Sequence, residues 1–108
     1  MTVNELCRMD GINVISLPDG EREINGVYIG DLLSWVMGRA RQDNIWITIM
    51  SNINTVAVAS LADVSCILLA EDVKLESDVA KAANEKGINV LSTSLSAYEA
   101  ALFLNKNL

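Results

Sequence analysis

Two uninterrupted apolar runs constrain the fold of this chain more than any other feature. Ile45–Met50 is rich in β-forming residues, Ser65–Ala70 is apolar almost throughout, and neither run contains a charge. A strand with one solvated face alternates apolar and polar residues, whereas a strand covered on both faces reads as a continuous apolar run. The two runs therefore predict strands in the middle of a parallel sheet with helices on both faces.

The remaining elements follow from turn residues and helical periodicity. Further strands are expected at Ile12–Leu17, Ile24–Ile29 and Ile88–Leu91, and helices are expected to start near Thr2, Gly30, Asn54, Ser77 and Ser96. From residue 24 onward, strand and helix alternate four times, which predicts an α/β fold with a small, mainly parallel sheet. The first strand is joined to the second by a short turn rather than by a helix. It can therefore pair differently from the parallel strands. No linker-like segment interrupts residues 1–108, so we expect one domain.

Charge limits the classes of partner. The chain carries a formal net charge of −6, with 8 lysines and arginines that are scattered rather than clustered. Nucleic-acid binding needs clustered cations, and a membrane-surface helix needs a basic face. We therefore expect no nucleic-acid partner and no membrane association. The first residues lack the pattern of a signal peptide, and the segment Ser51-Asn52-Ile53-Asn54-Thr55 interrupts the uncharged stretch 44–62, so a cytoplasmic location is expected.

The residues that most often carry catalysis are missing. The chain has no histidine, which removes Ser-His-Asp and Cys-His nucleophile systems and histidine-based metal sites. Its glycines form neither of the two common nucleotide-binding fingerprints. Cys7 and Cys66 are far apart in sequence and are expected to be buried thiols. The sequence predicts a protein that is not an enzyme and that has neither cofactor nor metal.

Polar residues gather where the predicted strands end. In open α/β sheets, ligands bind beyond the carboxyl ends of the strands, and helix N-termini there attract anions. The candidate ligand-binding residues are Gly30, Asp31, Ser51, Asn52, Glu71, Ser92 and Thr93. Ordinary helix capping explains the same residue types, because Ser, Asn and Asp are the usual N-caps. Both interpretations stay open at this stage.

Composition also indicates a covered apolar surface. Mean hydropathy is +0.30, which is high for a free-standing small domain. The helix through Asn54–Ala62 is apolar all round. Its expected inward face comprises Val56, Ala57, Ser60 and Leu61, and its expected outward face comprises Val58, Ala59 and Ala62. We expect a homodimer that uses this outward face together with Trp35, which falls off the inward stripe of its own helix. The alternative is that the first helix or the C-terminal segment covers the same face within one chain.

Several segments, taken in order, resemble a known family. The segment Gly26-Val27-Tyr28-Ile29-Gly30-Asp31-Leu32-Leu33-Ser34-Trp35-Val36-Met37, and then Ile47–Asn52, resemble stand-alone members of the DRTGG domain family. Glu21-Arg22-Glu23-Ile24, Ile67–Glu71 and Gly87–Thr93 are similar to the N-terminal domain of HPr kinase/phosphorylase. Two departures stand out. Leu32 occupies the place of the family's arginine, and Ala70-Glu71 stands where Thr-Gly-Gly would fall.

This resemblance implies a fold like the N-terminal domains of HPr kinase and the Mur ligases, in a bacterial protein. It also implies a regulatory or accessory role, because relatives are joined to CBS domains and to enzymes that carry the chemistry. The leading expectation is a non-catalytic regulatory or protein-interaction module. The second is a sensor that binds a small anionic or nucleotide ligand at the strand-end loops. An enzyme working with carboxylates and hydroxyls alone is third.

Overall fold

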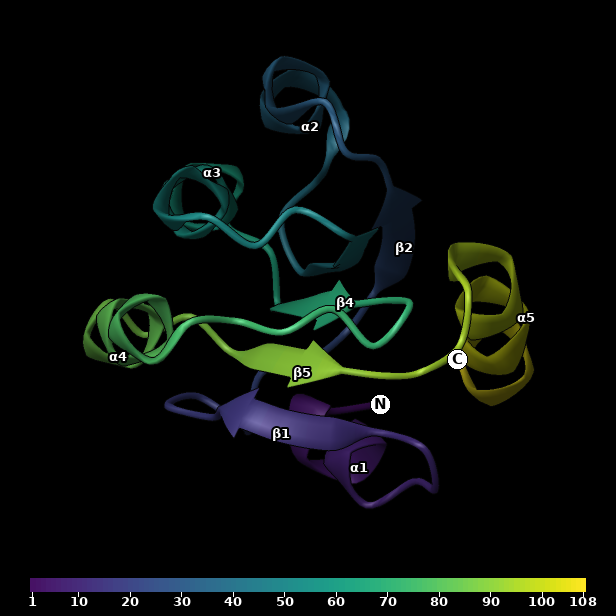
Figure 1. Ribbon diagram of the computed structural model, residues 1–108. Helices are drawn as coiled ribbons and strands as arrows, with labels where there is room; N and C mark the ends of the chain where they lie inside the picture. The colour runs from purple at the N-terminus through teal and green to yellow at the C-terminus, as the bar shows by residue number, and fades with distance from the viewer.

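The computed structural model describes all 108 residues and contains five helices and five strands (Figure 1). The helices are α1 (Val3–Cys7), α2 (Leu33–Arg39), α3 (Ile53–Ala62), α4 (Ser77–Glu85) and α5 (Ala97–Asn107). The strands are β1 (Asn13–Ser16), β2 (Gly26–Ile29), β3 (Asn44–Thr48), β4 (Cys66–Leu69) and β5 (Val90–Ser92). Each expected strand and helix is present, with ends that shift by a few residues. No helix has both the length and the apolar character needed to cross a membrane.

All five strands form one sheet in the order β1-β5-β4-β3-β2. Strands β2 to β5 are parallel, and β1 joins β5 in the antiparallel direction. The predicted α/β class and mainly parallel sheet are confirmed, and so is the different pairing of the first strand. The apolar runs become β3 and β4, which lie inside the sheet and are buried on both faces as their sequences require.

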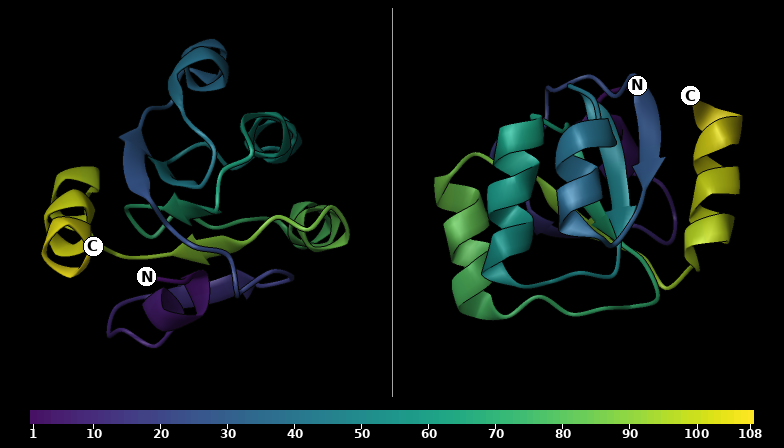
Figure 2. Two further views of the ribbon diagram at one scale, coloured as in Figure 1. Left: turned by 180° about the vertical axis from the view of Figure 1, so that it is seen from behind. Right: turned by 90° about the horizontal axis from the view of Figure 1, so that it is seen from above.

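Helices cover the two faces of the sheet in different numbers. Helices α2, α3 and α4 lie on one face, and α1 and α5 lie on the other (Figures 1 and 2). Residues along β3 alternate between the two cores, since Trp46 packs with the three-helix side while Ile45 and Ile47 pack with the two-helix side. The right-hand view of Figure 2 shows that α3, α4 and α5 all begin at the same end of the molecule. That end is the carboxyl edge of the parallel strands.

The predicted outward face of α3 is wrong. Val58 is 6% exposed and Ala59 is fully buried, and both belong to the core of this chain. Ala62 is partly buried against the same core, whereas Leu61, expected inside, is 74% exposed. The cause is the uniform apolar composition of the helix, because periodicity can choose a face only when polar residues mark the other face. Helix α3 packs between α2 and α4, which covers its flanks.

Paired charges fix the amino edge of the sheet beside β2. The Arg22 guanidinium donates from Nε to Asp43 at 2.9 Å and from an Nη to Asp63 at 2.7 Å. Partial burial would lower the Arg22 pKa, but the hydrogen bonds with the two carboxylates outweigh it and raise that pKa. Asp43 and Asp63 both adopt positive φ angles, at the turn before β3 and at the end of α3. One side chain therefore joins three turns of the chain.

Candidate functional site

The carboxyl edge of the sheet carries a shallow depression between the starts of α3 and α4. Its volume is about 390 Å³, and its lining comprises Ser51, Asn52, Ile53, Lys74, Glu76, Asp78 and Val79. The predicted residues Ser51 and Asn52 thus line a depression at the carboxyl edge, and ligand binding there stays a prediction. The Asn52 side chain also caps α3, since its amide oxygen accepts from the N–H groups of Asn54 and Thr55. Capping and pocket lining coexist at this residue.

The charges around this depression are mixed. Lys74 is its one cation, and the Lys74 ammonium donates to Asp72 at 3.2 Å. Glu76 and Asp78 add two carboxylates to the lining. Helix α4 begins without a side-chain cap from Glu76, but the Asp78 carboxylate accepts from the Val79 N–H at 2.9 Å in its first turn. The helix dipoles at these two starts favour an anion, whereas the excess of carboxylates in the lining opposes one.

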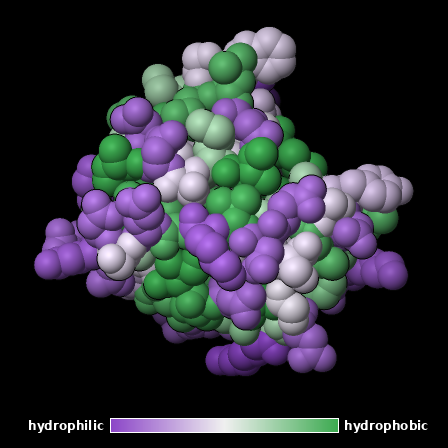
Figure 3. Space-filling view, in the orientation of Figure 1, coloured by the Kyte–Doolittle hydropathy of each residue, from purple (hydrophilic) through white to green (hydrophobic).

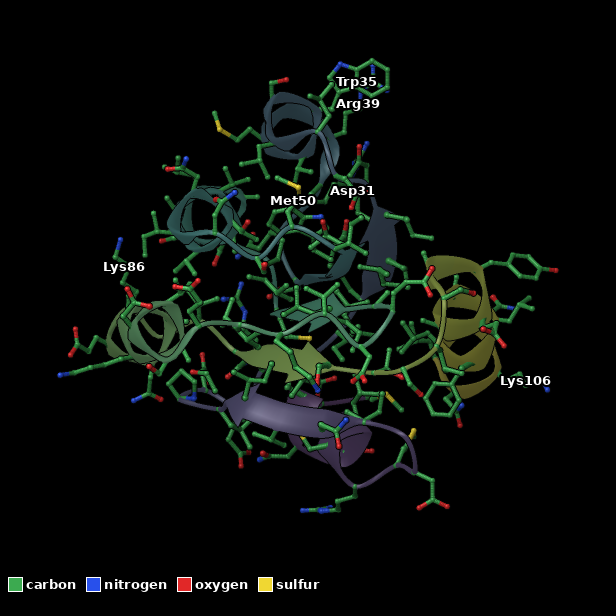
Figure 4. All side chains as sticks on the ribbon, in the orientation of Figure 1. Asp31, Trp35, Arg39, Met50, Lys86 and Lys106 are labelled. Carbon is green, nitrogen blue, oxygen red and sulfur yellow. The ribbon has the colours of Figure 1, made fainter.

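Asp31 belongs to a separate cluster at the end of β2. Its carboxylate accepts from the Thr48 hydroxyl at 2.8 Å and from the Ile49 N–H at 3.0 Å. The Gly30 carbonyl accepts from the Trp46 indole N–H at 2.8 Å. Asp31 lies beside the loop of Met50 below α2 (Figure 4). Its hydrogen bonds join the end of β2 to the end of β3. The structure does not bring it to the depression.

The remaining predicted residues form a third group in the β4–α4 and β5–α5 loops. Glu71 is exposed at a positive φ of 59°, and its N–H donates to the Leu95 carbonyl at 2.8 Å. Ser92 is 7% exposed and Thr93 is fully buried, with the Thr93 hydroxyl accepting from the Leu95 N–H. Burial directs Ser92 and Thr93 toward the sheet rather than toward a ligand. The seven predicted residues thus fall into three separate groups along one edge.

A second and larger hollow was not predicted from the sequence. It lies between the edge strand β2 and α5, has a volume of about 570 Å³, and is lined by Asn25, Gly26, Val27, Ile29, Tyr98, Ala101, Leu102, Asn105 and Leu108. We call it the β2–α5 groove. The sequence did contain a signal, because residues 98, 101, 102 and 105 recur at helical spacing. That stripe looks like a core face, but the buried residues of α5 are Ala100 and Leu104.

Trp35 remains on the surface, as its position off the inward stripe of α2 suggested. It is 53% exposed, and the Arg39 guanidinium carbon stacks 3.8 Å from the centre of its ring. Both side chains project away from the body of the protein at α2 (Figure 4). Apolar side chains also reach the surface elsewhere, and Figure 3 shows green apolar patches between purple polar ones. Part of the apolar residue content that raises the mean hydropathy therefore lies on the surface.

The two cysteines differ in burial. Cys66 is fully buried in β4, and burial raises the pKa of its thiol well above the ordinary value. Cys7 is partly exposed, and burial raises its thiol pKa against the opposing effect of Arg8. Neither thiol is activated as a nucleophile, since a reactive cysteine needs a lowered pKa. No group of three or more Cys, Asp or Glu side chains is arranged to hold a metal ion.

The fold is shared with a solved structure. The chain superposes with a TM-score of 0.77 on the structure of the CBS and DRTGG domains of the regulatory region of Clostridium perfringens pyrophosphatase, in complex with the activator diadenosine tetraphosphate. Sequence identity is 11%, so the likeness concerns the fold alone. The match covers 99% of this chain and 47% of the other, so this chain spans about half of that neighbour's length. No curated protein shows significant sequence similarity to the present chain.

A match to a protein-family model agrees with this fold. The model of the DRTGG domain family matches residues 5–107, which is nearly the whole chain. The matched region begins within α1 and ends with α5, so it contains every strand of the sheet, the whole depression and all of the groove's lining except Leu108. The chain therefore belongs to the DRTGG domain family.

Proposed function

We propose that this protein is a non-catalytic regulatory module that acts by binding, to a second copy or to a partner protein, rather than by chemistry. One observation carries the proposal: its fold matches, over 99% of its length, part of a region that regulates an enzyme. In this role the domain changes the activity of another protein through differential binding to two states. A bacterial cytoplasm and a homodimer belong to the same proposal, as does the likeness to the N-terminal domain of HPr kinase/phosphorylase.

The state of the thiols supports a role without catalysis. Both cysteines have raised rather than lowered pKa values, so neither is activated as a nucleophile. We expect purified protein to transfer no phosphate from ATP to a protein substrate and to hydrolyse no phosphoester. Incubation with labelled ATP and a panel of protein substrates tests this. Turnover that follows the protein through purification and disappears with an inactive variant would contradict the proposal.

A second candidate function is the binding of a small regulatory ligand in the depression at the starts of α3 and α4. The neighbour's activator is a nucleotide, which makes this class of ligand the first to test. Two features favour the depression, namely its position at the carboxyl edge and the helix starts that meet there. The lining counts against a polyphosphate, since two carboxylates face one paired lysine. This candidate therefore ranks second.

Thermal unfolding with a panel of nucleotides and phosphorylated metabolites tests the second candidate. A ligand present at 100 times its dissociation constant stabilises the folded state by about 2.7 kcal/mol. Lys74→Ala and Asn52→Ala should reduce the shift if the ligand lies in the depression, and Lys106→Ala on α5 is the control. An undiminished shift in both variants would place the ligand elsewhere. No shift with any compound would remove the sensor function.

A further inference from the structure

We propose that two copies of this chain associate through the free edge of β2 and the β2–α5 groove, so that their sheets join into one continuous sheet. This inference gives a surface to the homodimer in the proposed function. It replaces the face on α3 that burial has ruled out. It rests on the backbone of β2, on the apolar lining of the groove and on the distribution of charge.

The free edge of β2 offers unpaired backbone groups. The Gly30 N–H donates to Ile47 of β3, and strand residues alternate in direction, so Tyr28 also bonds toward β3. The N–H and C=O groups of Val27 and Ile29 consequently point away from the sheet. Figure 1 shows β2 at the end of the sheet, with its outer side open between α2 and α5. An edge of this kind is a template for another strand.

The side chains beside that edge are apolar and exposed. Val27 is 37% exposed and Ile29 is 46% exposed, and both line the groove toward α5. On the facing wall, Tyr98 is 72% exposed and Leu102 is 47% exposed. Burying apolar surface stabilises a complex by about 25 cal/mol per Å² removed from water, so covering this groove is favourable. A strand paired with β2 would seat its own alternate side chains over the groove.

Charge favours a second copy as the occupant. None of the nine residues that line the groove has a charged side chain, in a chain whose net charge is −6. Two acidic molecules repel each other least where they meet through an uncharged surface. The polar groups that α5 contributes to the lining, Tyr98 and Asn105, can each both donate and accept a hydrogen bond, whereas Asn25 already bonds to Gln42 and Asn44 within the chain. Such groups can pair with their own copies across a twofold axis, which charged groups cannot do.

The geometry fixes a register. Copies related by a twofold axis normal to the sheet pair their β2 strands antiparallel, and Tyr28 of each copy then lies opposite Tyr28 of the other. Val27 of one copy exchanges main-chain hydrogen bonds with Ile29 of its partner, and the reverse pair does the same. The same axis keeps both α5 helices on one face, where Tyr98 and Leu102 of the two copies close the groove.

The first test measures mass and the effect of charge at the interface. Wild-type protein at micromolar concentration should sediment with twice the 11.7 kDa mass of one chain. Ile29→Lys on the strand and Leu102→Lys on the helix should each give the monomer mass, with unchanged far-ultraviolet circular dichroism. Leu61→Lys is the matched control, because Leu61 is 74% exposed on α3, and it should leave the dimer intact. A monomeric wild type would end both the proposed dimer and this surface. A dimer that survives Ile29→Lys and Leu102→Lys would end the surface alone.

The second test measures the register. In an antiparallel pair the residues opposite each other at a non-hydrogen-bonded position have Cα atoms about 4.5 Å apart, which a disulfide can bridge. Tyr28→Cys should therefore form a disulfide between copies on mild oxidation, seen as a dimer on a non-reducing gel. Wild type, which keeps Cys7 and Cys66, should stay uncrosslinked under the same conditions. Failure of Tyr28→Cys to crosslink in a protein that is still dimeric would overturn the strand pairing.

Discussion

The two edge strands end the sheet in different ways. Strand β1 pairs antiparallel with β5, and its register shifts between Val14 and Ser16. Strand β2 pairs with β3 in an uninterrupted register over all of its residues. Irregular edges twist away from further strands, whereas regular edges invite them. We therefore expect β2, rather than β1, to be the edge that pairs with a further strand.

The anchoring of the two edges differs as well. The Ser16 hydroxyl of β1 donates to the Ile88 carbonyl at 3.2 Å, which draws this edge toward the segment before β5. The carboxyl end of β2 is held by the indole of Trp46 on Gly30 and by the carboxylate of Asp31 on β3. These bonds all lie on the inner side of β2. They keep the strand regular while leaving its outer side free.

The largest effect is expected from loosening β2. Trp46 is fully buried, so Trp46→Phe removes the donor to the Gly30 carbonyl and leaves unfilled volume in the core. We expect a loss of about 2–4 kcal/mol in the free energy of unfolding. Urea denaturation followed by circular dichroism measures it. Trp35→Phe is the control at an exposed tryptophan and should cost less than about 1 kcal/mol. Equal losses for the two substitutions would contradict the anchoring role.

A smaller loss is expected at the amino edge. Arg22→Met keeps much of the side-chain volume but removes the hydrogen bonds to Asp43 and Asp63. Hydrogen bonds to charged groups contribute about 1.5–3 kcal/mol, and the partial exposure of this site lowers the expected loss to about 1–2 kcal/mol. Arg22→Lys should recover part of it, because lysine keeps the charge without the planar fork. A change within a few tenths of a kcal/mol for Arg22→Met would show that these turns hold without the arginine.

The smallest effect on stability and on association should come from a substitution in β1. Val14 of β1 is 50% exposed, close to the 46% of Ile29 on β2. Val14→Lys should change the free energy of unfolding by no more than about 0.5 kcal/mol and should leave the sedimentation mass of the wild type unchanged. Ile29→Lys, which places the same side chain on the other edge, should halve the mass. If Val14→Lys dissociates the protein, the two edges do not differ as described.

Much of the fold was predictable, because its signals are local. The unbroken apolar runs identified β3 and β4, and the Thr2–Glu5 and Ser96–Glu99 capping boxes located the starts of α1 and α5. The orientation of α3 was not predictable, since an apolar helix between two others has no polar side to mark its face. The stripe on α5 was visible but ambiguous, because a core face and a docking face have the same periodicity.

The candidate site was predictable only in part. Ser51 and Asn52 line a depression at the carboxyl edge, and ligand binding there stays a prediction. Whether loop residues converge depends on tertiary hydrogen bonds, which a sequence does not display. The Asp31 carboxylate accepts a hydrogen bond from the Thr48 hydroxyl, and the buried Thr93 hydroxyl accepts one from the Leu95 N–H. The β2–α5 groove joins segments far apart in the chain, so the stripe on α5 could mark an apolar face but not the strand that lies opposite it.

Amide hydrogen exchange distinguishes a paired β2 edge from a free one. Exchange at Val27 and Ile29, resolved by NMR, is compared between the wild type and Leu102→Lys at equal concentration. Leu102 lies on α5, so this substitution removes association without touching the strand. We predict that both amides are protected in the wild type and exchange rapidly in the variant, while amides of β1 are the same in the two proteins. Rapid exchange at Val27 and Ile29 in a wild type that sediments as a dimer would contradict the claim that β2 is the joining edge.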